Sequence, residues 1–349
     1  MAGKRARTSN GSALADVAKR AGVSLATASR VLTESTHRVS GELRDRVLRA
    51  AESLDYVPNA SARSLTAGVR KIVGVLLHDM VDSQTHEYIR ALEEVADRAG
   101  WLIMLVNAGR NVDREFRYIR MFREERVGAI ILVGSGLEDP GYRERLEHVL
   151  GGYRRQGGRV AMTARHGLPF TEFAPDTVGG ASLACQHLLG FGHRRIGIIT
   201  GPRMITGTLD RLRGAKEAFA AAGVPWDDEL VAEGDFRRAS GVLACATLLS
   251  RAPDLTAIFA MSDDMAFGVY DVVHSRGMRI PEDLSVVGYD DAATSRDVVP
   301  ALTTVTYPTA ELARRAIEAC IGDVEPDRAQ VVIPCKLIVR ESVAAPRKS

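Results

Sequence analysis

The side chains best suited to chemistry in this 349-residue chain do not form the patterns that catalysis or metal binding require. Gly134-Ser135-Gly136 is an incomplete match to the glycine-rich turn of dinucleotide-binding enzymes, and the nucleophile elbow Gly-x-Ser-x-Gly of hydrolases is absent. The cysteines stand singly, without the paired spacing of zinc sites or disulfide frameworks. We therefore expect a protein that is not an enzyme and has no cofactor and no metal, whose thiols are core residues in a reducing cytoplasm. These cysteines are Cys185, Cys245, Cys320 and Cys335.

Residues 14–33 have the pattern of two short helices joined by a tight turn, which is a helix-turn-helix. Gly22 ends the first helix, because glycine accepts the left-handed conformation of a helix exit. Ser24 is placed to cap the second helix. Helical spacing turns Ala28, Val31 and Leu32 inward and leaves a small outward face that suits a DNA groove. That face consists of Leu25, Ala26, Ser29 and Arg30.

A third helix is predicted from Ser40 to Leu54, and a shorter one follows it. In residues 56–68, Pro58 breaks the chain, Asn59 can cap, and a helix of two turns can end at the following glycine. So short a helix is not expected to hold alone in water. A plain interdomain linker also fits this composition, but a linker gives no reason for an exposed Leu65 in so polar a segment.

The segment Asp16-Val17-Ala18-x-x-Ala21-Gly22-Val23-Ser24-x-x-Thr27 and the Ser29-Arg30-Val31-Leu32 that follows resemble the DNA-binding domain of the LacI family of bacterial repressors, with only Ala28 departing from the pattern. Residues 58–70 resemble the hinge helix of the same family, which inserts a leucine into the minor groove. This resemblance implies a set of DNA-contacting residues. They are Ser24, Leu25, Ala26, Thr27, Ser29 and Arg30 in the recognition helix, and Asn59, Ala62, Arg63 and Leu65 in the hinge.

The charge of the chain is unevenly distributed. Residues 1–70 carry a net charge of about +6, whereas the whole chain carries only +2, as expected of a phosphate-binding head on a neutral or acidic body. Residues 1–12 are predicted to be a disordered basic arm. No apolar run follows this arm, so it is not a secretory signal, and no segment approaches the about 20 apolar residues that would span a membrane.

The rest of the chain alternates short apolar runs with amphipathic segments, which indicates parallel sheets covered by helices on both faces. The length of this region suits two such sheets, and ligands bind beyond the carboxyl ends of parallel strands. Strands are predicted at 72–77, 101–106, 129–133, 160–162, 196–200, 257–260 and 284–287. Helices are predicted near 85–99, 112–124, 140–155, 179–190, 208–222, 236–250 and 264–276.

Several phrases of this region resemble, in order, the periplasmic-binding-protein-like core of the LacI family. They include Gly192-His193-Arg194-Arg195-Ile196, Met261-Ser262-Asp263-Asp264 and Ser285-Val286-Val287-Gly288-Tyr289-Asp290. The implied fold is a small all-α, three-helix domain followed by an α/β core of two parallel-sheet, Rossmann-like subdomains. The expected divisions are the helix-turn-helix domain at 13–57, the hinge at 58–70 and the core at 71–343. Within the core we expect one subdomain from 71–165 with 303–325, and another from 166–302 with 326–343.

The family resemblance also places a small-molecule cleft between the two subdomains. Arg211 matches an arginine that grips ligand hydroxyls, Asp290 matches a carboxylate that accepts from them, and Phe236 falls where some sugar-responsive relatives stack an aromatic ring. Asp263 is expected to supply another polar contact. After the first strand, Asp79-Met80-Val81-Asp82-Ser83 lacks the aromatic pair common in the family, so a sugar is a better candidate than a purine-like ligand. Asp79 is expected in the polar wall of this cleft.

Taken together, these resemblances predict a cytoplasmic transcriptional repressor that binds a pseudopalindromic operator as a homodimer and answers to a small molecule, such as a sugar or sugar derivative. A solute-binding protein for a transporter would share the core but would need a signal peptide and would lack the basic head. A LacI-like regulator whose core responds to a protein partner instead of a metabolite remains the alternative.

Overall fold

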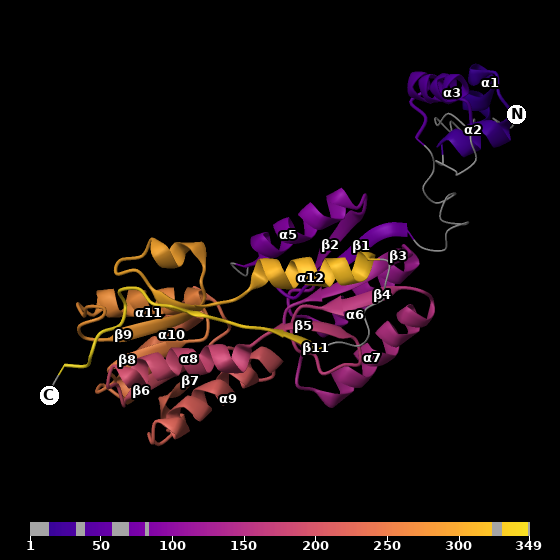
Figure 1. Cartoon of the computed structure of the whole chain (residues 1–349). Helices are drawn as coiled ribbons and strands as arrows, with labels where there is room; N and C mark the ends of the chain where they lie inside the picture. The colour runs from indigo at the N-terminus through magenta and orange to yellow at the C-terminus, as the bar shows by residue number, and fades with distance from the viewer. Residues whose placement is uncertain (1–13, 33–38, 58–69, 81–83, 323–329, 348–349) are drawn as a thin grey trace, which may run out of the picture. The chain divides into compact units, whose positions relative to one another are not determined.

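The computed structural model describes residues 14–32, 39–57, 70–80, 84–322 and 330–347. Its contacts divide the chain into two compact units, with the boundary in the sequence between Arg70 and Lys71, and we describe each unit by itself (Figure 1). Among the described residues, no helix is long and apolar enough to cross a membrane. The predicted hinge residues Asn59, Ala62, Arg63 and Leu65 lie outside the described residues.

The first unit is a three-helix domain made of α1 (Leu14–Ala21), α2 (Leu25–Leu32) and α3 (Gly41–Ser53). Gly22 has φ +64°, the left-handed conformation that ends α1. Ser24 Oγ accepts a hydrogen bond of 3.1 Å from the backbone N–H of Thr27, which caps α2 as the sequence predicts. The small core is formed by Val17, Ala18, Ala21, Ala28, Val31, Val47, Ala50 and Ala51.

The second unit contains two six-stranded sheets, each at the centre of a lobe. The first sheet has the strand order β11-β5-β4-β3-β1-β2, and helices cover both of its faces. Alternate residues of β1 point to opposite faces, so Val75 packs toward α5 and α12 while Leu76 packs toward α6 and α7. These elements form the first lobe. They are β1 (Arg70–Leu77), α5 (Thr85–Arg98), β2 (Leu102–Asn107), α6 (Val112–Glu124), β3 (Val127–Val133), α7 (Pro140–Arg155), β4 (Arg159–Met162), β5 (Thr171–Pro175), α12 (Thr309–Ile321) and β11 (Gln330–Ile333).

The second sheet has the order β12-β10-β9-β8-β6-β7, with β12 antiparallel to β10. Helix α8 packs against α9, and α10 packs against α11. These elements form the second lobe. They are α8 (Thr177–Gly190), β6 (Ile196–Thr200), α9 (Thr206–Ala221), η1 (Asp228–Leu230), β7 (Val231–Glu233), α10 (Arg238–Arg251), β8 (Ala257–Ala260), α11 (Asp263–Ser275), β9 (Ser285–Asp290), η2 (Ala293–Arg296), β10 (Thr303–Thr306) and β12 (Leu337–Ile338).

The predicted fold class is confirmed, and all seven predicted strands are present. The division of the core between the lobes differs from the expected one. β5 and β11 belong to the first sheet and β10 to the second, so the chain passes between the lobes after β5, after β10 and after β11. The sequence hid this because β10 reads Thr-Thr-Val-Thr and β5 reads Thr-Glu-Phe-Ala-Pro, and neither is a continuous apolar run. The expected boundary at residues 165/166 therefore wrongly assigns β5 to the second lobe. The expected boundary at 302/303 wrongly assigns β10 to the first lobe.

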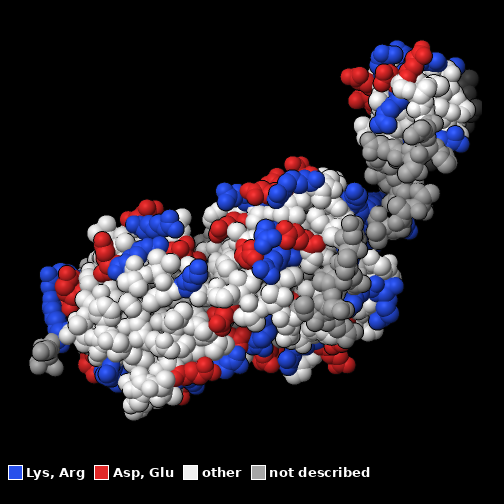
Figure 2. Space-filling view, in the orientation of Figure 1, with Lys and Arg blue, Asp and Glu red and all other residues white. Residues whose placement is uncertain are grey.

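Charged side chains of both signs are mixed on the face of the two lobes that Figure 2 shows. Exposed ion pairs of the two lobes include Arg238 with Asp271 and Arg314 with Glu318. On this face the lobes show no large region of one sign of charge.

Candidate functional site

A cavity of about 420 Å³ lies between the two lobes, at the carboxyl ends of their parallel strands. From the first lobe it is lined by the residues after β1, β2 and β3 and by the start of α5. From the second lobe it is lined by the first turns of α9 and α11, by the β7–α10 loop and by the end of β9. Ligand sites in α/β proteins occur at such strand ends, and the volume suits a small molecule.

Arg211 projects from the second turn of α9 and is buried in the cavity wall, with 7% of its surface exposed. Its Nη1 donates a 2.7 Å hydrogen bond to the carbonyl of Met261, and its Nη2 lies 3.5 Å from Asp290 Oδ1. Burial opposes the charged form, but the Asp290 carboxylate offsets this and the pKa of Arg211 is raised. The Nε of Arg211 is buried and has no hydrogen-bond partner in the part of the chain that the structure describes. This side chain is therefore held in the cavity wall by the Met261 carbonyl and by Asp290.

Asp290 is the last residue of β9 and lines the same cavity. Its φ of +114° is rare for a residue with a side chain, and strained conformations of this kind concentrate at functional sites. Gln84 of the first lobe donates a 2.9 Å hydrogen bond to the Asp290 carbonyl and accepts one from Thr309 Oγ1. The sequence-predicted pair of Arg211 and Asp290 is thus brought together.

Phe236 lies in the β7–α10 loop and is partly buried, with φ +69°. Its ring occupies the space above Gly201, where a Cβ atom would overlap the ring. The ring centroid is 5.2 Å from Cζ of Arg110 and 5.8 Å from Cζ of Arg211. The ring lines the cavity, as the family resemblance implies.

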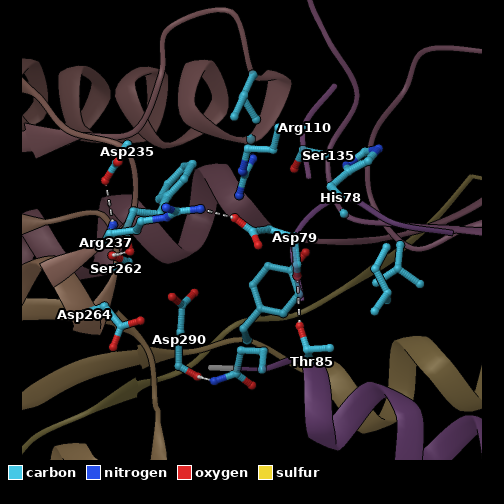
Figure 3. Close-up of a pocket in the computed structure, with 18 of the residues that line it drawn as sticks. His78, Asp79, Thr85, Arg110, Ser135, Asp235, Arg237, Ser262, Asp264 and Asp290 are labelled. Atoms are coloured by element: carbon cyan, nitrogen blue, oxygen red, sulfur yellow. Dashed lines mark hydrogen bonds and ion pairs between the residues drawn. The ribbon is translucent and has the colours of Figure 1, made fainter. Parts of the chain in front are cut away.

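Asp79 follows β1 and also lines the cavity (Figure 3). Its Oδ2 accepts a 3.0 Å hydrogen bond from Nη2 of Arg237, which belongs to the opposite lobe. Its backbone carbonyl accepts a hydrogen bond from Thr85 Oγ1 at the start of α5. The polar wall expected after the first strand is present, with one oxygen of Asp79 held by a neighbouring arginine.

Asp263 does not line the cavity, which corrects the expectation for this residue. It is fully buried and its carboxylate accepts hydrogen bonds from the Ala292 N–H, from Ser295 Oγ and from Thr304 Oγ1. Burial raises its pKa to about 7. Asp263 therefore joins α11 to the loop after β9 and to β10, while the next residue, Asp264, faces the cavity.

Several polar residues of the cavity were not expected from the sequence: His78, Gln84, Arg110, Ser135, Arg237, Ser262 and Asp264. His78, Ser135 and Ser262 lie within two residues of the end of a strand, so the rule that ligands bind at carboxyl ends could have indicated these three. Burial, followed by the charges of His166 and Arg110, lowers the pKa of His78 to about 3. His78 therefore presents a neutral imidazole, which can both donate and accept a hydrogen bond.

The predicted DNA-reading residues of the first unit lie on or directly before α2. Leu25, Ala26 and Arg30 are exposed, and Ser29 is partly exposed. Leu25 exposes 54% of its surface and is not part of the small core of this unit. Ser24 and Thr27 are joined by a side-chain hydrogen bond of 2.8 Å at the start of the helix.

No group of three or more His, Cys, Asp or Glu side chains is arranged to hold a metal ion among the described residues. The four cysteines are free and buried. Burial raises the pKa of their thiols, to about 12 for Cys245 and Cys320 and to about 11 for Cys335. Such thiols behave as core residues and not as nucleophiles.

A helix-turn-helix head and a two-lobed core with a polar cavity define a DNA-binding regulator controlled by a ligand. Residues 13–59 match the model of bacterial regulatory proteins of the lacI family, and residues 185–343 match a periplasmic binding protein-like domain. The chain belongs to the LacI family.

Known relatives agree over nearly the whole length of the chain. The HTH-type transcriptional regulator GalR of Salmonella typhimurium (strain SL1344) is 33% identical, with 95% of this chain and 96% of GalR covered. A solved complex of the regulator CelR with cellobiose is 31% identical, with a TM-score of 0.69 and coverage of 95% of this chain and 99% of CelR. A lac repressor dimer bound to operator and an anti-inducer has a TM-score of 0.83 at 24% identity, with 96% and 100% covered, which supports the fold. These relatives are named as regulators and repressors and not as enzymes, as the sequence predicts.

Proposed function

We propose that this protein is a repressor that binds a pseudopalindromic operator as a homodimer, with an affinity controlled by a neutral, hydroxyl-rich small molecule such as a sugar or sugar derivative. The pair of Arg211 and Asp290, which lie 3.5 Å apart in the wall of the cavity between the lobes, carries the effector part of this proposal. A guanidinium donor beside a carboxylate acceptor suits adjacent hydroxyl groups.

The remaining cavity wall supports a neutral ligand. Arg211 is paired with Asp290 and Arg237 with Asp79, so these charges are balanced within the site. The Phe236 ring offers an apolar face on which a sugar ring can stack. The cellobiose bound in the CelR complex supports the same class of effector.

For DNA, the supporting observation is the exposed end of α2. Leu25 and Ala26 open this helix and expose apolar side chains that core packing does not need. We propose that they contact thymine methyl groups in the major groove, with Ser24, Thr27, Ser29 and Arg30 beside them. The hinge residues Asn59, Ala62, Arg63 and Leu65 are proposed to contact the minor groove. A protein acting on chromosomal DNA in this way would work in the cytoplasm.

A panel of mono- and disaccharides tests the effector part of this proposal. Each sugar is titrated against the thermal unfolding of the full chain, because a ligand that binds the folded core raises its melting temperature. Sugars that raise the melting temperature are then added to operator-binding assays, in which the effector must change the affinity. If no sugar of the panel acts in either assay, the alternative of a core that responds to a protein partner is favoured.

A further inference from the structure

The loop from Asp235 to Arg237 is held by the opposite lobe at two separate points. Arg237 Nη2 donates to Asp79 Oδ2 at 3.0 Å, and Asp79 follows β1 of the first lobe. The Arg110 guanidinium, which follows β2 of the first lobe, lies over the ring of Phe236 at 5.2 Å. All four residues line the cavity, so these contacts lie across it.

The two first-lobe residues are themselves fixed in position. The Arg110 N–H donates a 2.7 Å hydrogen bond to the carbonyl of His78, which ties the end of β2 to the end of β1. The Asp79 carbonyl accepts a hydrogen bond from Thr85 at the start of α5. A loop that touches these residues is therefore placed against a rigid edge of the first lobe.

Other contacts between the lobes differ in burial. Thr206 donates through its backbone N–H to the Gly136 carbonyl and through Oγ1 to the Arg165 carbonyl, and Arg165 pairs with Asp210 at 2.7 Å. In the Arg165–Asp210 pair 37% and 9% of the two side chains are exposed, against 60% and 11% in the Arg237–Asp79 pair, and Thr206 is fully buried. Water and salt therefore reach the Arg237–Asp79 pair more readily, through its arginine, so this pair opens at lower cost.

We propose that residues 235–237 form a lid over the cavity, and that the Arg237–Asp79 ion pair and the Arg110–Phe236 contact hold this lid shut. The loop can move while the buried contacts at Thr206 and Asp210 keep the lobes together. A ligand then enters when the ion pair breaks and is retained when the pair forms again. The lid sets how fast the effector enters and leaves the cavity. This inference rests on the proposed function only for the identity of the molecule in the cavity.

A thiol placed inside the cavity reports on the lid without any effector. Val133 lines the cavity and is 6% exposed, so the thiol introduced by Val133→Cys is reached through the cavity mouth. The rate of its reaction with a small water-soluble maleimide is measured in the full chain, with the unsubstituted protein as the blank for the four buried native cysteines. Arg237→Gln breaks the ion pair at an exposed position and leaves the core intact.

The lid predicts that Arg237→Gln raises the labelling rate about two- to fivefold, the factor that corresponds to an exposed ion pair. High salt should accelerate labelling of the parent but not of Arg237→Gln. The exchanged pair, Asp79→Arg with Arg237→Asp, should restore the slow rate, while either single reversal accelerates it. The matched control is Arg203→Gln, which removes an equally exposed arginine paired with Glu233 inside the second lobe.

Equal labelling rates in Arg237→Gln and Arg203→Gln would overturn the lid, as would fast labelling in the exchanged pair once its melting temperature shows a folded core. The proposed function is tested separately. Sugars can still raise the melting temperature in a protein that has no lid, and a lid can control thiol access in a protein whose effector is not a sugar.

Discussion

The guanidinium of Arg211 lies over the ring of Tyr289, with 3.9 Å between Cζ and the ring centroid. Tyr289 is fully buried and directly precedes Asp290 on β9, so the strand supplies both the surface beneath the arginine and the carboxylate beside it. The planar group is held in one orientation in the cavity wall. Lysine has neither the plane nor the fork of this group.

The first prediction follows from this contact. Arg211→Lys and Arg211→Ala should both bind operator DNA, because Arg211 is in the core and not in the head. Both should need a higher effector concentration for half-maximal response, by roughly 10- to 150-fold for each charge-assisted hydrogen bond of about 1.5–3 kcal/mol that is lost. The measurement is operator affinity as a function of concentration of the sugar that most stabilises the parent.

Arg213→Ala is the matched control for this experiment. Arg213 lies two residues further along α9, its side chain is 60% exposed, and it pairs with Asp210 outside the cavity. Its removal should leave the effector response unchanged. A normal response in both Arg211 variants would place the effector elsewhere.

The second prediction separates two adjacent aspartates. Asp263→Ala leaves the Ala292 N–H and the hydroxyls of Ser295 and Thr304 without their buried acceptor, at about 1–3 kcal/mol for each group left unsatisfied. We expect its melting temperature to fall by about 2–4 °C per kcal/mol lost. Asp264→Ala should keep the melting temperature but alter the effector response. A larger loss of stability in Asp264→Ala would contradict these assignments.

The same pair shows how far sequence could predict the site. The motif Met261-Ser262-Asp263-Asp264 places a carboxylate at the start of a helix, but adjacent helical residues point about 100° apart, and only the fold decides which one faces the cavity. Arg211 and Asp290 were expected because the family resemblance implies an arginine and a carboxylate at these two positions. Arg237 and Asp79 are 158 residues apart, and their contact depends on how the two lobes meet, which no local pattern records.

The burial of a strand decides whether it can be predicted from the sequence. Strands buried on both faces, such as Val127–Val133, are continuous apolar runs and are visible in the sequence. β11 at the edge of the first sheet and the short β12 at the edge of the second are only partly buried. Because they are only partly buried, these strands need no continuous apolar run and are not visible in the sequence. The chain passes from the first lobe to the second between β11 and β12, so the division between the lobes could not be predicted either.

The third prediction concerns pH. Glu115 is buried in α6 and accepts a 2.9 Å hydrogen bond from Tyr142, and burial raises its pKa to about 7. The folded protein therefore binds a proton more tightly than the unfolded chain does. This contribution to stability is present at low pH and is lost as pH rises from about 4.5 to about 7, by at most about 3 kcal/mol.

Glu115→Gln keeps the acceptor for Tyr142 and removes the titration. Its melting temperature relative to the parent should rise between pH 5 and pH 8, because only the parent must bury a charge at the higher pH. An exposed control is Glu124→Gln on the same helix, whose melting temperature should differ from that of the parent by the same amount at both pH values. A constant difference between Glu115→Gln and the parent would mean that Glu115 does not titrate in this range.

The last prediction concerns DNA reading by α2. Leu25 and Ala26 neither donate nor accept side-chain hydrogen bonds, so their discrimination rests on thymine methyl groups and on exclusion. Leu25→Gln with Ala26→Asn introduces donors and acceptors on an exposed face, while Ala28 and Val31 keep the helix packed. We expect a changed half-site in selection from randomised operators, with the original operator bound about 5- to 150-fold more weakly, the cost of one mismatched contact. Non-specific DNA binding should survive, because it rests on phosphate contacts.

Leu48→Gln, at a 43% exposed leucine on α3, is the matched control and should keep the original half-site. An unchanged half-site in the α2 variant, or the same loss in Leu48→Gln, would show that α2 does not read the bases at these two positions.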